Sequence, residues 1–335
     1  MPQLENRAKS NTKQLLFTII KITVTALLVI LIFRQADWKK VLYSLRHADL
    51  FLISIVLVCL FANVSISTLK WRILLKVHKI TYSFKELQRY YFIAVFFNNF
   101  LPTNIGGDAF RIYKTLDNNR SKTGAILAVF VERLTGILAL LILGLAMFIY
   151  LEGKNFAGPF ETRTIIILIG IFILCGVVLI ALYYLARKTL IKTGRLPWRL
   201  MLLVDHIRHY LNNPEKVVYI IVISFAFHLF TVFWMTLLIR ALGPSFPPTF
   251  LIIVLAVSNL AAMLPISING IGLMDGSFIY VASRLGMGYD QALMVMLFNR
   301  VLLILLSLVG AAYYIKDKSA ITNMVPSLQK IRPKH

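Results

Sequence analysis

Apolar blocks of about 20 residues, separated by short basic loops, recur along the chain. An α-helix of that length spans the hydrocarbon core of a bilayer, which is about 30 Å thick. With 59% hydrophobic and 15% charged residues and a mean hydropathy of +0.77, the chain is too apolar for a soluble domain. We therefore predict an all-α polytopic membrane protein with about six to eight transmembrane helices and two broken or re-entrant segments.

The basic loops orient these helices, because lysines and arginines between spans hold the cytoplasmic side and contact anionic lipid headgroups. They also explain the formal net charge of +22. We expect residues 1–14 to form a cytoplasmic N-terminus, residues 15–315 a single membrane domain, and residues 316–335 a basic cytoplasmic tail. The predicted full spans are 15–33, 50–69, 125–151, 164–186, 217–239 and 292–315, and 34–49 contains a short amphipathic helix.

Composition also limits the chemistry. No basic stretch lies in a recognisable nucleic-acid module, so we expect no nucleic-acid partner. The six histidines show no metal-ligand spacing. We expect no metal, no cofactor and no catalytic residue. Within the spans, we expect His228 to be a hydrogen-bonded buried histidine and Asn63 to serve helix–helix contacts.

Two apolar runs, 90–101 and 249–264, are short for a crossing and stop at a Leu-Pro pair. Each then opens into Asn, Gly and an Asp. Irregular backbone cannot face hydrocarbon, so these breaks must line an enclosed or wet cavity. Glycines let a ligand approach the backbone, and free N–H groups can hold an anion. We expect the two breaks together to hold the substrate.

The two breaks belong to a predicted inverted repeat with halves at about 86–151 and 249–315. A shift of 167 residues places Asp108 on Asp275 and Arg133 on Arg300. By loop charge the third and last spans run in opposite directions, as in transporters with broken helices near the midplane. Our candidate substrate-binding residues are Asn98, Asn99, Pro102, Asn104, Gly106, Gly107, Asp108, Arg111, Glu132, Arg133, Pro265, Ser267, Asn269, Gly270, Gly272, Asp275, Asn299 and Arg300.

Arg133 and Arg300 lie at matching depths in their spans, about 12 Å along the helix. A charge there costs a few kcal/mol, so each arginine should face the interior and be paired or used. The planar guanidinium suits a phosphate. The alternative is structural: Arg133 pairs with Asp108 or Asp275, and Arg300 pairs with another internal acid. The two interpretations, phosphate binding and a structural ion pair, are compatible if the ion pair of the resting state opens to admit a headgroup.

Three motifs carry a resemblance to a known family. They are Pro102-x-Asn-x-Gly-Gly-Asp-x-x-Arg111, Glu132-Arg133-Leu134, and Leu-Pro-Ile-Ser-Ile-Asn-Gly-Ile-Gly-Leu-Met-Asp-Gly at 264–276. With them the chain resembles the lysylphosphatidylglycerol synthase transmembrane region, a flippase-like family also called UPF0104, over about residues 12–318. The family pattern more often has Glu than Asp at position 275, and an acid where this chain has Gly136.

The resemblance implies a multi-pass protein of the prokaryotic plasma membrane that moves or presents a lipid. The lipid would be an anionic or aminoacylated phospholipid or a polyprenyl-phosphate lipid. Long members of the family carry a soluble domain that transfers lysine from lysyl-tRNA to phosphatidylglycerol, and we expect this chain to be a short form without it. Two other functions stay open: a lipid-modifying transferase that uses Asp108, Glu132 or Asp275, and a partner subunit for a separate aminoacyltransferase or glycosyltransferase.

Overall fold

The computed structural model describes residues 23–100, 106–116, 122–152, 210, 212–262, 267 and 270–316. Every regular element in these ranges is a helix. The helices are Thr23–Arg34, α2 (Trp38–Arg46), α3 (Leu50–Val77), α4 (Phe84–Phe100), α5 (Gly106–Thr115), α6 (Lys122–Glu152), α9 (Pro214–Ala241), α10 (Pro248–Ala262), α11 (Leu273–Arg284) and α12 (Tyr289–Lys316). This confirms the predicted fold class. The predicted span at 164–186 lies outside the described residues.

Four of these helices, α3, α6, α9 and α12, are long and apolar enough to cross a membrane. Large apolar side chains cover their outer faces, as expected for helices that face lipid. Examples are Val58, Phe130, Val222 and Leu308, which are all exposed in the structure. The helices α4 and α10 have only 17 and 15 residues, so they reach about 26 and 23 Å. Both stop before the breaks, as the sequence predicts.

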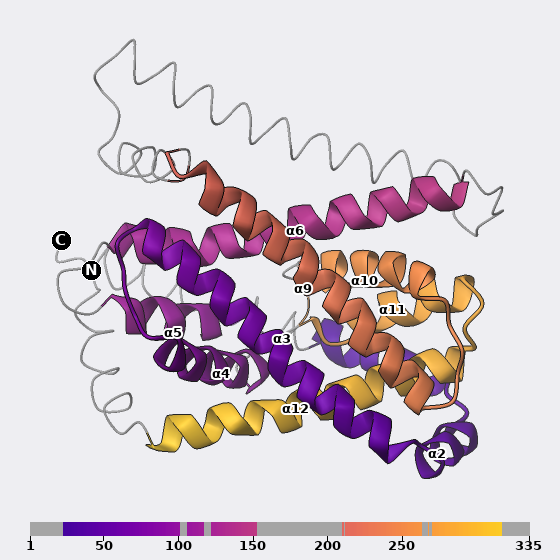
Figure 1. The fold of residues 1–335 in the computed structure, drawn as a ribbon. Coiled ribbons are helices and arrows are strands. Elements are labelled where there is room, and N and C mark those ends of the chain that lie inside the picture. The colour runs from indigo at the N-terminus through magenta and orange to yellow at the C-terminus, as the bar shows by residue number, and fades with distance from the viewer. Residues whose placement is uncertain are drawn as a thin grey trace, which may run out of the picture.

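The helices form two four-helix units in the same order, α3 to α6 and α9 to α12 (Figure 1). The starts of α9 and α10 follow those of α3 and α4 by 164 residues, and the starts of α11 and α12 follow those of α5 and α6 by 167. The helices α6 and α12 run in opposite directions, as do α3 and α9 (Figure 1). The units are therefore inverted, and each begins one long helix earlier than the halves predicted from the sequence.

The two units are interleaved. Helix α4 of the first packs on α12 of the second, α10 of the second packs on α6 of the first, and α3 packs on α9. Glycines permit both exchanged contacts. A Cβ at Gly310 of α12 would collide with the backbone carbonyl of Phe92, and a Cβ at Gly144 of α6 would lie 2.8 Å from Cβ of Ala256. Phe92 and Ala256 are both the ninth residue of their helices.

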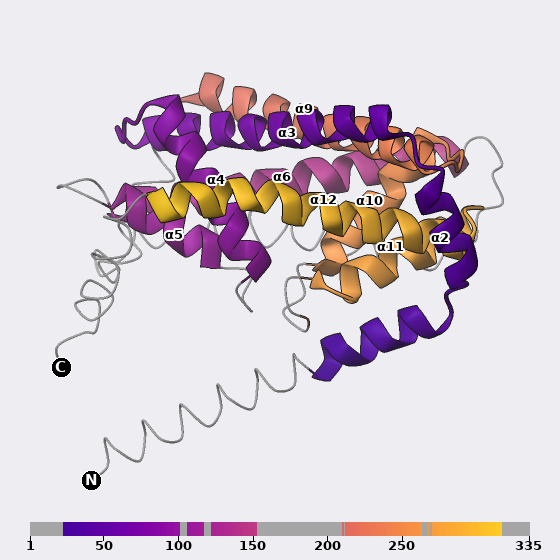
Figure 2. The same cartoon turned by 90° about the horizontal axis from the view of Figure 1, so that it is seen from below.

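The helix Thr23–Arg34 lies against the second unit, beside α11 and the start of α12 (Figure 2). Its Leu28 fills the space next to Gly272, and the hydroxyl of Tyr289 donates a hydrogen bond of 2.9 Å to the carbonyl of Ile32. Gly272 has φ +80°, which a glycine adopts without strain. The first turn of α11 is thus covered by the N-terminal helix.

The C-terminal part of α3 differs from the prediction. The sequence placed the end of this span at residue 69 and read Lys70 as a cytoplasmic charge. Helix α3 instead continues to Val77, and Lys70 and Trp71 are 6% and 0% exposed. Trp71 belongs to a core cluster that draws most of its residues from α3, α4, α5 and α6. Local charge cannot reveal this, because burial depends on the helices that pack around the residue.

Candidate functional site

The candidate site of the first unit begins where α5 docks on α4. The backbone N–H of Gly107 donates a 2.9 Å hydrogen bond to Oδ1 of Asn98. A side chain at this glycine would collide with the carbonyl oxygen of Ala94, so the two helices approach closely only because it has none. The first turn of α5 is therefore fixed, and it carries the buried carboxylate of Asp108. Asn98 therefore has a structural role, because its side chain holds the start of α5 against α4.

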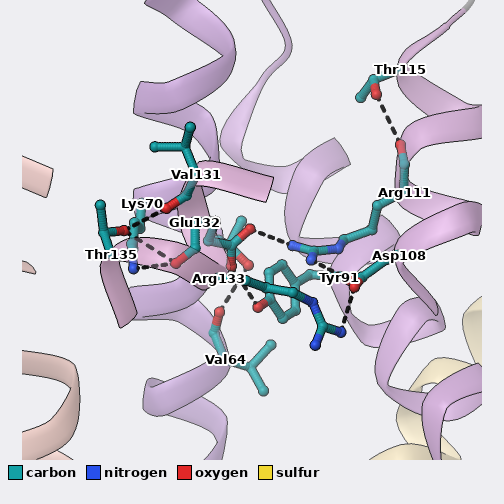
Figure 3. Close-up of polar contacts among 11 residues, drawn as sticks. Val64, Lys70, Tyr91, Asp108, Arg111, Thr115, Val131, Glu132, Arg133 and Thr135 are labelled. Atoms are coloured by element: carbon teal, nitrogen blue, oxygen red, sulfur yellow. Dashed lines mark hydrogen bonds and ion pairs between the residues drawn. The ribbon is translucent and has the colours of Figure 1, made fainter. Parts of the chain in front are cut away.

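Arg111 is the buried cation of this site, with a side chain that is 4% exposed. Its two terminal nitrogens donate to separate carboxylates: Nη2 to Oδ1 of Asp108 at 2.6 Å, and Nη1 to Oε2 of Glu132 at 2.7 Å (Figure 3). The rings of Trp71 and Tyr91 lie 5.0 and 4.4 Å from the guanidinium carbon. These charge-assisted and cation–π contacts compensate for the desolvation of a charge in the protein interior.

Arg133 shares the carboxylate of Asp108. It pairs with Oδ2, whereas Arg111 binds Oδ1 (Figure 3). The side chain of Arg133 is 45% exposed. The sequence predicted an interior position for Arg133, and the structure corrects this, because Arg111 takes the interior position and Arg133 the margin. The alternative from the sequence, an ion pair between Arg133 and Asp108, is present.

Lys70 of α3 adds a third cation. Its Nζ donates a 2.8 Å hydrogen bond to the backbone oxygen of Glu132, while the carboxylate of that residue accepts from Arg111 and, at 2.8 Å, from the hydroxyl of Tyr91. The cluster therefore contains three cationic side chains and two carboxylates. Its formal charge is positive, and both carboxylates are already held by arginines.

The second unit repeats only part of this arrangement. Arg300 binds Asp275 through two parallel hydrogen bonds, each of 3.1 Å. The same carboxylate accepts the N–H of Gly272 at 3.0 Å and so caps the start of α11. Counting along the repeat, this ion pair is the counterpart of Arg133 and Asp108. It confirms that the aspartate and arginine matched in the sequence also meet in space.

The buried charges have no counterpart in the second unit. Residues at the matching places are neutral: Trp234, Met235, Leu255, Phe278 and Asn299 stand for Lys70, Trp71, Tyr91, Arg111 and Glu132. All five are buried. Asn299 is 2% exposed, and its Oδ1 has no hydrogen-bond partner among the described residues. The same packing position therefore tolerates either a charged network or neutral side chains.

The remaining candidates divide into two groups. Asn99 donates a 3.2 Å hydrogen bond to the carbonyl of Leu303 and so connects α4 to α12. Gly106 is the first residue of α5, and Gly270 has φ +69°. Ser267 is buried, and its hydroxyl has no hydrogen-bond partner among the described residues. Pro102, Asn104, Pro265 and Asn269 lie outside the described residues. Whether the two breaks meet in one chamber therefore stays a prediction.

Other polar residues in the spans behave as the sequence predicts. Nε2 of His228 donates a 2.8 Å hydrogen bond to the carbonyl of Gly136, and Nδ2 of Asn63 donates 3.4 Å to the hydroxyl of Thr231. Sequence reasoning missed Lys70, Trp71 and Tyr91 as parts of the charged cluster. In the described ranges, no group of three or more His, Cys, Asp or Glu side chains could hold a metal ion.

Comparison with known proteins gives the family. The family model described as the lysylphosphatidylglycerol synthase TM region matches residues 18–310, which is most of the chain. No curated protein matches the chain. The matched segment contains every helix that positions the charged cluster. This protein is a multi-pass membrane protein related to lipid modification or translocation, and it belongs to the family of the lysylphosphatidylglycerol synthase TM region.

Proposed function

We propose that this protein translocates a membrane lipid, or presents it to another protein, by binding the phosphate of its headgroup at the charged cluster of the first unit. The acyl chains stay in the bilayer. An anionic phospholipid, an aminoacylated phospholipid and a polyprenyl-phosphate lipid all carry such a phosphate. The proposal extends the family's relation to lipid modification or translocation to a specific recognition step.

One observation carries the proposal: the cluster has an excess of positive charge, whereas the matching positions of the second unit are neutral and buried. Isolated or imperfectly paired charges are costly among apolar helices. The second unit builds the same packing from neutral residues such as Phe278 and Asn299. A buried charge that an equivalent position does without is better explained by ligand binding than by stability.

Arg133 gives the cluster a place for the phosphate. Its side chain is partly exposed, and its carboxylate partner Asp108 is also held by Arg111. A phosphate can therefore replace Asp108 at Arg133 while Asp108 keeps its bond to Arg111. Such an exchange leaves no carboxylate without a cation, so the site opens at little electrostatic cost.

This geometry favours binding over acid–base catalysis. A general base must be able to accept a proton from the substrate. Asp108, Glu132 and Asp275 each bind an arginine instead. Each carboxylate is therefore engaged by a guanidinium group and is not free to contact a substrate proton. A lipid-modifying transferase is therefore the second candidate function, after lipid translocation or presentation.

Translocation can be tested in liposomes that contain the protein and fluorescent phosphatidylglycerol, with dithionite reducing the label in the outer leaflet. We expect Arg133→Gln to slow lipid exchange by about tenfold or more, because charge-assisted hydrogen bonds to phosphate contribute about 1.5–3 kcal/mol. Arg133→Lys should retain part of the rate, since it keeps the charge and loses the fork. Lys122→Gln, at the exposed start of α6, is the matched control.

The outcomes separate the possible functions. Normal exchange in both Arg133 variants would contradict the role of this arginine. Exchange no faster than in empty liposomes, together with retained phosphatidylglycerol binding, would favour the lipid-presenting function.

A further inference from the structure

Among the described residues, Lys70 is the one cation of the cluster that forms no direct ion pair with a carboxylate, although the negative charge of Glu132 acts on it. Its ammonium group has three N–H donors. The hydrogen bond described for it goes to a backbone oxygen, that of Glu132, at 2.8 Å. The side chain lies in the interior, where a cation without a direct ion pair is costly. This excess charge is the starting point of the inference.

The space beside Lys70 is lined by Gly136 of α6. A Cβ placed on Gly136 would lie 3.7 Å from Nζ of Lys70 and 4.0 Å from Nε2 of His228, which are ordinary van der Waals distances. The glycine thus leaves room for an atom of about the size of a methyl group in contact with a buried ammonium group. Its three walls come from α3, α6 and α9, which pack on one another.

His228 forms a hydrogen bond with the backbone oxygen that would otherwise repel an anion in this space. The carbonyl oxygen of Gly136 carries partial negative charge, and His228 donates a hydrogen bond to it at 2.8 Å. The oxygen is therefore occupied by a donor. The single N–H of Nε2 is used in this bond, so the ammonium group of Lys70 is the donor nearest the open side of Gly136 that can still bind an anion.

The space also lies close to the place proposed for the headgroup. Arg133 and Gly136 are three residues apart on α6, so their positions are neighbours on the helix surface. Arg133 is 45% exposed, whereas Lys70 is 6% exposed. The two cations therefore form a series that leads from the margin of the cluster to its interior.

We infer that Lys70 and the open side of Gly136 form a second phosphate subsite, which takes the phosphate from Arg133 as the headgroup moves inward. This inference rests on the proposed function and extends it. The ligand class is a phosphate-bearing headgroup, and Lys70 serves as the point charge that binds it. In the second unit, Trp234 stands at the place of Lys70, so the repeat has no second copy of this subsite.

Binding in detergent micelles tests the subsite apart from transport. The probes are fluorescent phosphatidylglycerol, fluorescent diacylglycerol, which lacks a phosphate, and sodium phosphate as a competitor. We expect Lys70→Met to weaken phosphatidylglycerol binding by about tenfold or more and to leave diacylglycerol binding unchanged. Lys76→Met, at an exposed position of the same helix, should bind as the wild type does.

A matched pair at residue 136 separates charge from bulk. Gly136→Asp places a carboxylate beside Lys70 and should block phosphatidylglycerol, while Gly136→Asn has nearly the same volume and no charge and should retain most of the binding. If both variants lose binding equally, the effect is steric and the inference is wrong. Circular dichroism of each variant verifies that the helices are intact.

Further outcomes decide between sources of the phosphate and between the two proposals. Competition by sodium phosphate would support a subsite that also binds free phosphate. If sodium phosphate does not compete but Lys70→Met still weakens phosphatidylglycerol binding, the subsite binds the phosphate of a lipid headgroup alone. Unchanged phosphatidylglycerol binding in both Lys70→Met and Gly136→Asp would overturn the subsite, even if Arg133 variants still slow transport. Weakened binding in these variants without any lipid exchange by the wild type would contradict translocation and keep the subsite.

Discussion

Replacing Arg111 and Glu132 by their counterparts in the second unit tests whether the buried charges are needed for folding. The single variant Arg111→Phe removes the cation that holds the Glu132 carboxylate at 2.7 Å. Only the hydroxyl of Tyr91 then remains as a described side-chain partner of that carboxylate. The double variant Arg111→Phe/Glu132→Asn removes both charges and recreates the pair formed by Phe278 and Asn299.

The expected magnitudes follow from burial. Both side chains are less than a tenth exposed, at 4% and 8%. Removing one partner of such a pair costs about 3–5 kcal/mol, whereas replacing both by packed neutral residues is often close to neutral. In the double variant the hydroxyl of Tyr91 exchanges a carboxylate for an amide oxygen as its acceptor, and this neutral hydrogen bond is weaker by about 1 kcal/mol. We therefore expect the loss in the free energy of unfolding of the double variant to be smaller, by at least about 2 kcal/mol, than the sum of the losses of the two single variants.

The free energy of unfolding can be measured by titrating SDS into mixed micelles and following helix content by circular dichroism. A double-mutant cycle with Arg111→Phe, Glu132→Asn and the double variant gives the coupling energy. We expect the double variant to fold and to exchange lipid slowly. If its loss of stability equals the sum of the single losses, the pair does not act as a unit, and the comparison between the two units fails.

Two further predictions concern stability. Gly310→Ala should destabilise the protein by about 1–3 kcal/mol, because its Cβ would collide with the carbonyl of Phe92, whereas Gly276→Ala, with its nearest described neighbour, Cδ1 of Ile32, 3.6 Å away, should have little effect. Equal stability of the two variants in the SDS titration would contradict the close α4–α12 contact. Burial raises the pKa of Tyr210, whose hydroxyl lies 2.9 Å from Nε2 of His78, above its ordinary value of about 10. Because the pKa is raised in the folded state, the contribution of Tyr210 to the free energy of unfolding is complete below about pH 10 and is lost as the pH rises through the folded-state pKa. Above about pH 10, Tyr210→Phe should therefore lose less stability than the wild type does. An identical alkaline profile would show that Tyr210 remains neutral in both states or does not contribute.

Much of the fold follows from local composition. The long apolar helices, the amphipathic helix at residues 38–46 and the two short helices before the breaks were all predicted, because hydrocarbon length and apolar periodicity fix them within a segment. The match of Asp108 with Asp275 and of Arg133 with Arg300 was also visible in the sequence. In the structure, Asp108 forms an ion pair with Arg133, and Asp275 forms one with Arg300.

The sequence was less informative about the exchanged helices. A shift of 167 residues aligns only the later helices of each unit, because α3 and α4 match α9 and α10 at 164. The predicted halves at 86–151 and 249–315 include α4 and α10 but omit α3 and α9, which carry no matching motif in the sequence. Nor does any local pattern reveal that α4 packs on α12 and α10 on α6.

The sequence by itself determined the membrane class, the places where helices break and the alignment of Asp108 with Asp275 and of Arg133 with Arg300, because each depends on residue type and spacing along the chain. Only the tertiary structure decided that Arg111 is buried while Arg133 lies at the margin, and that Lys70 faces the protein interior. These assignments depend on how α3, α5, α6 and α9 meet. Burial and charge compensation are properties of several helices at once, so no single stretch of sequence contains them.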